Sequence, residues 1–278
     1  MSDAIKITLF LPKGDAKSIQ IAEISNWSGK GMAAPRNEMQ DFLCRKELEQ
    51  AGVYILIGIN PDDGEPLAYV GEAEVLKDRL RNHYANKDFW DQVIVFMSKD
   101  ENLTKAHVRY LESLLITEAT QIGRSKLDNT QTSNAKLPEA DTHDMIGFMA
   151  KIKQLLPVIG SDLLTPISNK NDERILVFKI KGHIAKGNRT NSGFVVYKGS
   201  ETVIELLSSA KQWKWLITHR KNLQDKGSLI LKNNKLVFTK DVEFSSPSAA
   251  AAIICGGSAN GLTAWKDKDG KTLKELEA

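Results

Sequence analysis

The sequence predicts an α+β protein with two domains, each made of short strands and helices. Three observations support this class. Short runs alternate apolar and polar residues between Gly, Pro, Asn and Asp turns, longer segments place apolar residues three and four apart, and a polar segment around Pro166 separates two such halves. We expect a small, three-stranded, mainly antiparallel sheet flanked by helices in the first domain. The predicted parts are residues 1–49, a hairpin and helix packed on the next part; 50–160, the first domain; 161–173, a linker; and 174–278, a C-terminal α+β domain.

Composition is that of an ordinary globular chain. Of its 278 residues, 26% are charged and 41% hydrophobic, and the formal net charge is +3. This charge permits a nucleic-acid partner without requiring one. Cys44 and Cys255 form no CxxC pair, so we expect both to be reduced core residues. The N-terminus lacks a signal-peptide pattern and no apolar run is long enough to span a bilayer, which predicts a cytoplasmic protein without a membrane partner.

The N-terminal part is predicted from short-range patterns. Residues 5–11 and 18–24 read as strands around a Pro-Lys-Gly-Asp turn. Residues 26–36 are rich in Gly and polar side chains, which predicts a loop. Residues 37–50 have helical spacing of apolar positions.

Residues 52–71 read as the β-hairpin around which the first domain is organised. Val53, Ile55, Ile57 and Ile59 recur with period two, and Asp63-Gly64 supplies turn chemistry. Alternation places Tyr54 on the opposite face.

After the hairpin, residues 74–86 have helical spacing, and Arg79 and His83 lie four residues apart. They would direct a guanidinium and an imidazole toward one point, or lie on a solvated face. Glu112 lies within the apolar stripe of a predicted helix over 103–122. Because burying an unpaired carboxylate is costly, we expect either that its pKa is raised or that it binds a cation. A salt bridge to a nearby arginine is the alternative.

Two further elements are predicted in this domain. Residues 91–98 form a near-continuous apolar strand, and residues 141–156 form a helix capped by Asp141 or Thr142.

Two short signatures at the ends of the hairpin strands resemble those of a known family. Gly52-Val53-Tyr54 and Tyr69-Val70-Gly71 are similar to the paired signatures of the GIY-YIG nucleases. In that family an arginine, a histidine or tyrosine, a glutamate and an asparagine follow in order. The matching residues here are Arg79, His83, Glu112 and Asn129, with Asn134 as an alternative for the last. The resemblance covers roughly residues 50–130.

The resemblance implies a metal-dependent endonuclease that hydrolyses phosphodiester bonds in DNA, with RNA as an alternative substrate. It implies that Glu112 holds one Mg²⁺ or Mn²⁺, Tyr54 takes a proton from water, and Arg79 stabilises the charge on the phosphate. Tyr69 would orient water or phosphate, His83 would relay the proton, and Asn129 would brace the metal end. The residues expected to contact nucleic acid are Gly71, Lys77, Arg81, Lys211 and Lys214.

One position departs from the family pattern. Many relatives carry a lysine where this chain has Glu72, and a carboxylate adds negative charge beside the phosphate unless it binds metal or pairs with Arg79. The alternative function is therefore a weak or inactive nucleic-acid-binding or regulatory protein on the same scaffold. A third reading is a module whose C-terminal part binds protein.

The C-terminal part is predicted as α+β. We expect strands over 174–180 and 193–197, a helix over 212–223, a hairpin joining 229–231 to 236–238, and a helix over 249–254 capped by Ser246. Its end is similar to a small domain of unknown function often found after such nuclease domains. Lys211 and Lys214 lie among tryptophans. This pattern suits nucleic-acid binding, with lysines on phosphates and tryptophans stacked on bases. The alternative is an amphipathic helix that buries the tryptophans and exposes the lysines.

Overall fold

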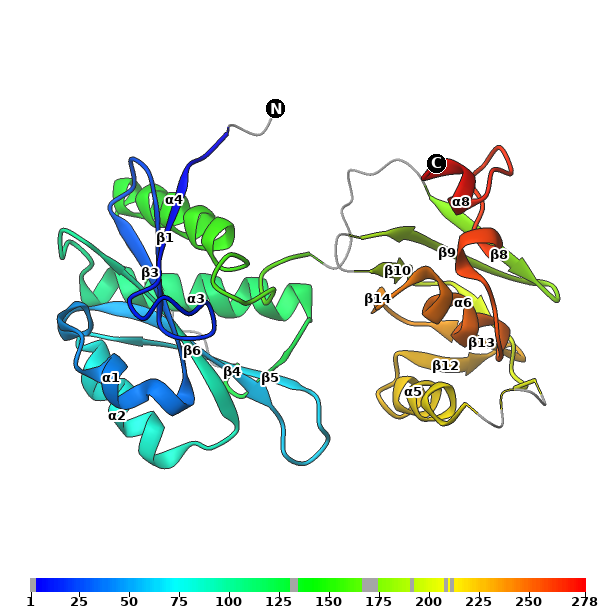
Figure 1. Cartoon of the computed structure of the whole chain (residues 1–278), viewed down its shortest axis with the longest axis horizontal. Helices are drawn as coiled ribbons and strands as arrows, with labels where there is room; N and C mark the ends of the chain where they lie inside the picture. Colours follow the sequence, from blue (N-terminus) through cyan, green and yellow to red (C-terminus); the bar gives the residue numbers. More distant parts are fainter. Residues whose placement is uncertain (1–3, 131–134, 167–174, 191–192, 208–209, 211–212) are drawn as a thin grey trace. The chain divides into compact units, whose positions relative to one another are not determined.

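A computed structural model describes residues 4–278, apart from 131–134, 167–174, 191–192, 208–209 and 211–212. The chain divides into two compact units, residues 1–165 and 166–278, coloured blue to green and green to red in Figure 1. Each unit contains strands and helices, so the α+β class is confirmed. Most of the linker predicted over 161–173, from residue 167 onward, lies outside the described residues.

The first unit is built on a seven-stranded sheet in which the predicted hairpin lies between β6 and the edge strand β7. Its order is β1-β2-β3-β6-β4-β5-β7, and all neighbours are antiparallel except β5 and β7. The small three-stranded sheet expected from the sequence is not confirmed, because β6, β4 and β5 continue into β3, β2 and β1. The strands are β1 (Ile7–Phe10), β2 (Gln20–Ile24), β3 (Gly29–Pro35), β4 (Gly52–Ile59), β5 (Pro66–Ala73), β6 (Trp90–Ser98) and β7 (Lys126–Leu127).

Helices cover both faces of this sheet. Val53 and Ile55 of β4 pack in one core with α3 and α4, while Tyr54 and Leu56 pack in the other with α1 and α2. The alternation predicted for this strand is thus confirmed, and Tyr54 faces the side that α2 covers. The helices are α1 (Met39–Leu43), α2 (Leu76–Asn86), α3 (Lys105–Ile122) and α4 (Glu139–Leu155), with short 3-10 helices η1 (Arg36–Glu38) and η2 (Lys46–Glu49).

The loop predicted over residues 26–36 is wrong, because β3 lies there between β2 and β6. Glycine is used in this strand for close packing. A Cβ at Gly31 would lie 2.9 Å from the Phe96 ring, and one at Gly29 would meet the Trp27 ring at 2.0 Å. Met32, Ala33 and Ala34 are buried, which places the strand inside the sheet.

The single helix predicted over 37–50 is divided into η1, α1 and η2. Phe42 and Leu48 are both fully buried in the same core. On one continuous helix, positions six apart would point about 120° away from each other. The extended backbone at Arg45 turns the chain so that both side chains reach the core. A smaller correction concerns α4, which begins after Pro138, so neither Asp141 nor Thr142 is its N-cap.

The second unit contains two small sheets around one core. Their orders are β14-β10-β9-β8 and β11-β13-β12. Trp265 is fully buried in this core, donates through Nε1 to the Pro247 carbonyl at 3.1 Å, and packs on Phe194. The elements are β8 (Leu176–Ile180), β9 (His183–Arg189), β10 (Phe194–Val196), β11 (Glu201–Thr202), α5 (Lys214–Asp225), β12 (Leu229–Lys232), β13 (Lys235–Phe238), β14 (Val242–Phe244), α6 (Pro247–Cys255), α7 (Gly261–Ala264) and α8 (Leu273–Leu276).

Two local predictions in this unit are confirmed. Asn233 and Asn234 both have positive φ, 50° and 59°, and join β12 to β13 as a tight hairpin. Ser246 caps α6 by accepting a hydrogen bond from the Ala249 N–H, and Pro247 occupies the first turn.

The surface differs from expectation at one cysteine. Cys255 is buried, but Cys44 is exposed, so the prediction that both are core residues is wrong for Cys44.

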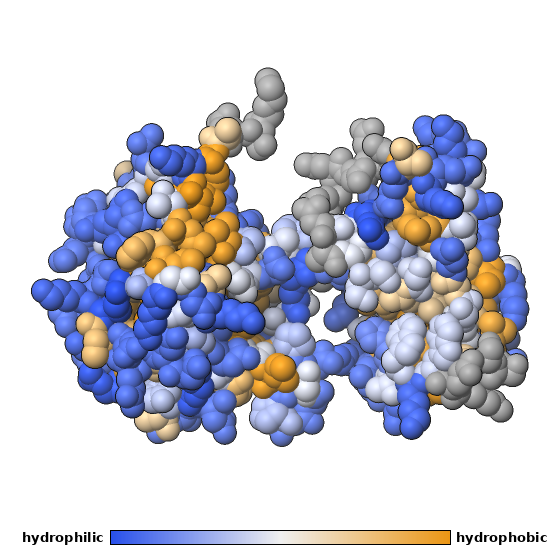
Figure 2. Space-filling view, in the orientation of Figure 1, coloured by the Kyte–Doolittle hydropathy of each residue, from blue (hydrophilic) through white to orange (hydrophobic). Residues whose placement is uncertain are grey.

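Apolar surface lies over the edge strand β1, where Leu9 and Phe10 are exposed (Figure 2). Among the described residues, no helix combines the length and hydrophobicity that crossing a bilayer requires.

Candidate functional site

Four of the predicted residues meet on the α2 side of the sheet. Tyr54 on β4 lies opposite Gly71 on β5, and α2 carries Arg79 and His83 over them. The Tyr54 hydroxyl lies 2.7 Å from His83 Nε2, and Arg79 Nε donates to the same hydroxyl at 3.2 Å. The i, i+4 spacing on α2 therefore brings a guanidinium and an imidazole to one phenol.

Gly71 is required by this arrangement. A Cβ at this position would lie 2.3 Å from the Tyr54 hydroxyl oxygen and 2.4 Å from the ring carbon that carries it. The missing side chain thus makes the space in which the Tyr54 phenol lies across β5. This role is structural, and the nucleic-acid contact expected of Gly71 stays a prediction.

Burial determines the charge of the two buried members of the cluster. It raises the pKa of Tyr54 well above its ordinary value, with the nearby Tyr69 adding to the rise, and lowers the pKa of His83 to about 4. Both are therefore neutral at pH 7. Arginine can only donate, so the Tyr54 oxygen accepts from Arg79, and its O–H is free to donate to His83 Nε2.

Tyr69 of β5 and Lys87, the residue that follows α2, extend the cluster. The Tyr69 ring centroid lies 6.1 Å from that of Tyr54 and 5.0 Å from that of His83. Lys87 Nζ lies 4.8 Å from the Tyr69 ring centroid and pairs with Asp128 at 2.5 Å. Sequence reasoning missed Lys87, which follows His83 by four residues but lies just after the end of α2, with extended backbone.

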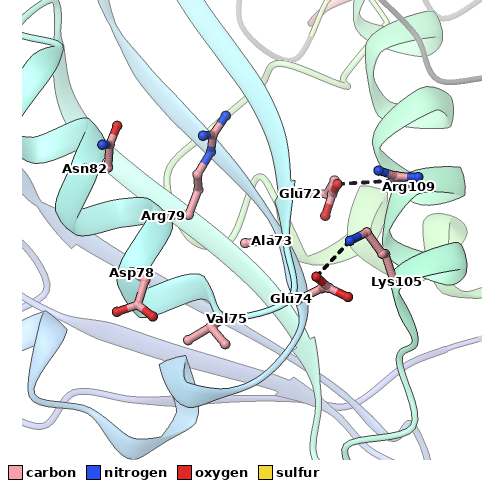
Figure 3. A pocket seen from close by; sticks show the side chains of 9 residues that line it. All are labelled: Glu72, Ala73, Glu74, Val75, Asp78, Arg79, Asn82, Lys105 and Arg109. Carbon is pink, nitrogen blue, oxygen red and sulfur yellow. Dashed lines mark hydrogen bonds and ion pairs between the residues drawn. The ribbon is translucent and has the colours of Figure 1, made fainter.

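Beside this cluster an open cleft of about 560 Å³ lies between α2, the end of β5 and the start of α3. In Figure 3, Asp78, Arg79 and Asn82 come from α2, whereas Lys105 and Arg109 come from α3. Its basic groups include Arg79, Lys105 and Arg109, which suit an anionic ligand. The sequence analysis overlooked Lys105 and Arg109, although their i, i+4 spacing on α3 was a usable signal.

The two glutamates that line the cleft pair with cations of α3. Glu74 binds Lys105 at 2.9 Å, and Glu72 binds Arg109 at 3.5 Å (Figure 3). Glu72, the position that departs from the family pattern, therefore pairs with Arg109.

Glu112 lies half-buried on α3, one turn after Arg109. Burial raises its pKa, and the nearby Glu72 carboxylate raises it further, while a hydrogen bond from the Glu72 backbone opposes the rise. Two carboxylates that repel each other in this way offer hard oxygen ligands to a divalent cation. Among the described residues, no group of three or more His, Cys, Asp or Glu side chains could hold a metal. A Mg²⁺ ion would fit only as one held by two carboxylates, with water and phosphate completing its shell.

Asn129 contacts the main chain of β5. Its Oδ1 accepts from the Val70 N–H at 3.1 Å, and its Nδ2 donates to the Val70 carbonyl at 2.6 Å. The alternative residue, Asn134, lies outside the described residues.

The remaining predicted nucleic-acid contacts are dispersed. Lys77 pairs with Glu49 at 2.9 Å and Arg81 with Asp78 at 3.2 Å, both on α2. Lys214 is exposed at the start of α5 in the second unit, and Lys211 lies outside the described residues. Of the two tryptophans in the amphipathic-helix reading, Trp213 packs against the core of the second unit, as that reading expects, whereas Trp215 is 47% exposed and contradicts it.

The fold and the site thus define a two-unit α+β chain with a Tyr-His-Arg cluster beside a basic cleft. Residues 176–277 match the family described as Domain of unknown function (DUF4357), which confirms the predicted similarity of the C-terminal part to such a domain. No curated protein and no solved structure matches the chain. The comparisons show no nuclease domain, so the resemblance of residues 50–130 stays a hypothesis.

Proposed function

We propose that the first unit is a metal-dependent endonuclease that hydrolyses phosphodiester bonds in DNA. The observation that carries this proposal is the hydrogen-bonded cluster of Tyr54, His83 and Arg79 beside a cleft with further cations. Phosphodiester hydrolysis needs a cation for the charge that develops on the phosphate and a route for the proton of the attacking water. The cluster offers both within one hydrogen-bond chain.

In this proposal each member has a defined role. Arg79, which is exposed and lines the cleft, turns toward the phosphate and uncovers the buried Tyr54 hydroxyl. Tyr54 then accepts the water proton as its own proton passes to His83 Nε2, so no phenolate has to form beforehand. Burial supports this relay, because it keeps His83 neutral and its nitrogen able to accept.

The residues that would hold a metal ion are Glu112 and Glu72. A bound Mg²⁺ or Mn²⁺ would supply a positive charge for the phosphate and the leaving oxygen. The raised pKa of Glu112 supports this assignment, because a divalent cation between the two carboxylates would relieve their repulsion.

A second candidate function is nucleic-acid binding without cleavage, to DNA or RNA. Two observations favour it. The Tyr54 hydroxyl belongs to a fully buried side chain, and the Glu72 carboxylate adds negative charge to a cleft that would hold phosphate. Arg109 pairs with Glu72 and neutralises part of its charge, so the second of these observations argues less strongly against catalysis.

The test is nicking of supercoiled plasmid, and cleavage of branched and single-stranded oligonucleotides, with Mg²⁺ or Mn²⁺. We expect metal-dependent cleavage that Tyr54→Phe and Glu112→Gln each reduce by at least about 100-fold, as is typical when a group acting in the transition state is removed.

Matched controls are Tyr84→Phe on α2 and Glu118→Gln on α3. Both residues lie away from the cluster, Tyr84 against Arg36 and Glu118 paired with Lys153, and both variants should cleave as the wild type does. Absence of cleavage with binding that falls steeply as salt rises would support the second function. Cleavage that survives both site variants would refute the assignment of this site.

A further inference from the structure

A second pocket lies wholly within the C-terminal unit. It encloses about 260 Å³ between α5, the hairpin β12-β13 and the segment after β11. Its walls are mainly aliphatic, from Ile204, Leu206, Ile217, Leu231 and Leu236. All but Leu236 are exposed, and Leu231 is 64% exposed, so an apolar surface is open to a ligand.

Arg220 is the unusual residue of this pocket. Its side chain lines the pocket although the residue is only 4% exposed. Among the described residues, neither Nη1 nor Nη2 has a hydrogen-bond partner. Burial lowers the pKa of its guanidinium, yet an arginine stays charged at neutral pH. A buried, unpaired charge is costly unless a partner satisfies it.

The surroundings of Arg220 offset only part of this cost. A Cβ at Gly256 would lie 3.2 Å from Nη1, so the guanidinium packs against the C-terminal end of α6. That end carries partial negative charge, which favours a cation. The Cys255 thiol is also near enough to act on its pKa, but burial keeps that thiol protonated by raising its own pKa. Neither of these two neighbours carries a full negative charge that would pair with the Arg220 guanidinium.

Neighbouring residues on α5 face the same pocket. Ile217, Arg220, Lys221 and Gln224 follow the i, i+3, i+4, i+7 rule and all line it. One helix face thus presents a guanidinium, an ammonium and an amide opposite aliphatic walls. This is the usual composition of a small-molecule site, an apolar cavity with a few convergent polar groups.

We propose that this pocket binds a carboxylate carried on an aliphatic body, with the carboxylate paired to Arg220. A carboxylate has one charge and two coplanar oxygens that pair well with a guanidinium, and the buried Nη1 and Nη2 of Arg220 have no partner among the described residues. The aliphatic walls favour a hydrocarbon body over the sugars that flank a phosphodiester. The carboxylate belongs to a free short-chain acid or to the C-terminus of a peptide. This site does not depend on the function proposed for the first unit.

The experiment measures binding to the full chain by calorimetry and by thermal shift. The probes are octanoate, a peptide ending in Leu-Val with a free carboxylate, and the same peptide amidated. We expect saturable binding of octanoate or of the free peptide, and no binding of the amide. Binding of octanoate alone would identify a free acid as the source of the carboxylate. Binding of the free peptide alone would identify the C-terminus of a chain as its source. Arg220→Met should weaken the binding by roughly 10- to 100-fold, as expected for loss of a charge-assisted hydrogen bond.

The matched control is Lys232→Met, which also removes one cation from this unit. Lys232 is exposed on β12 next to Leu231, and alternation directs it to the opposite face of the hairpin. This variant should bind as the wild type does. Equal binding of the amide or unchanged binding by Arg220→Met would overturn the proposal.

A second readout separates a ligand site from a structural arginine. Without ligand, Arg220→Met replaces an unpaired buried charge with an apolar side chain of similar length. We expect the melting temperature of the ligand-free variant to equal or exceed that of the wild type. A clear fall in melting temperature, with no response of the wild type to any carboxylate probe, would mean that Arg220 only supports the fold.

Discussion

Gly71 shows how one missing side chain positions a functional group. Because its Cβ would lie 2.3 Å from the Tyr54 hydroxyl oxygen, Gly71→Ala must displace the phenol or the strand. We expect a loss of about 1–3 kcal/mol in the free energy of unfolding, typical of overpacking, measured by urea denaturation. Gly147→Ala is the control, since its new Cβ meets nothing within 4 Å in the middle of α4. It should stabilise the protein by about 0.5–1 kcal/mol. Equal effects of the two variants would contradict this role for Gly71.

His83 makes stability depend on pH in a defined window. Its folded pKa of about 4 lies below the ordinary 6.5, so the unfolded chain binds more protons between these values. Stability should therefore fall as the pH is lowered from about 6.5 to about 4, by up to roughly 3 kcal/mol. The check is urea denaturation at several pH values, compared with His83→Gln, which removes the titrating group. An equal fall over this window in both proteins would assign the effect to other groups.

At the scale of elements, Asn129 substitutes for strand pairing at the edge of β5. The strand β7 pairs with β5 over only two residues, and Asn129 then binds both the N–H and the carbonyl of Val70. Asn129→Ala should cost about 1–2 kcal/mol and speed hydrogen exchange at the Val70 amide. Asn86→Ala, on the exposed side of α2, should change stability by less than about 0.5 kcal/mol. An unchanged exchange rate at Val70 would show that β5 is held by its other neighbours.

At the scale of the whole molecule, each unit buries its own core. Leu111 is fully buried in the first unit and Leu216 in the second. Each Leu→Ala substitution should cost about 2–5 kcal/mol. In calorimetry of the full chain, we expect two transitions, with each variant lowering only the transition of its own unit. A single transition lowered by both variants would show that the two units unfold together.

The sequence by itself determined those features that depend on local interactions. The hairpin of β4 and β5, the Asn233-Asn234 turn and the Ser246 cap were predicted because turn, cap and alternation rules involve residues close in the chain. The spacing on α2 likewise placed Arg79 and His83 together.

Only the tertiary structure decided features that depend on distant neighbours. Gly31 was assigned to a loop from its local composition, but in the structure its missing side chain leaves room for the Phe96 ring of β6. The pairing of Glu72 with Arg109 and the burial of Arg220 follow from packing between separate elements, which no local pattern encodes. Burial changes the cost of a charge and the space for a side chain, and for these residues it is set by segments far away in the sequence.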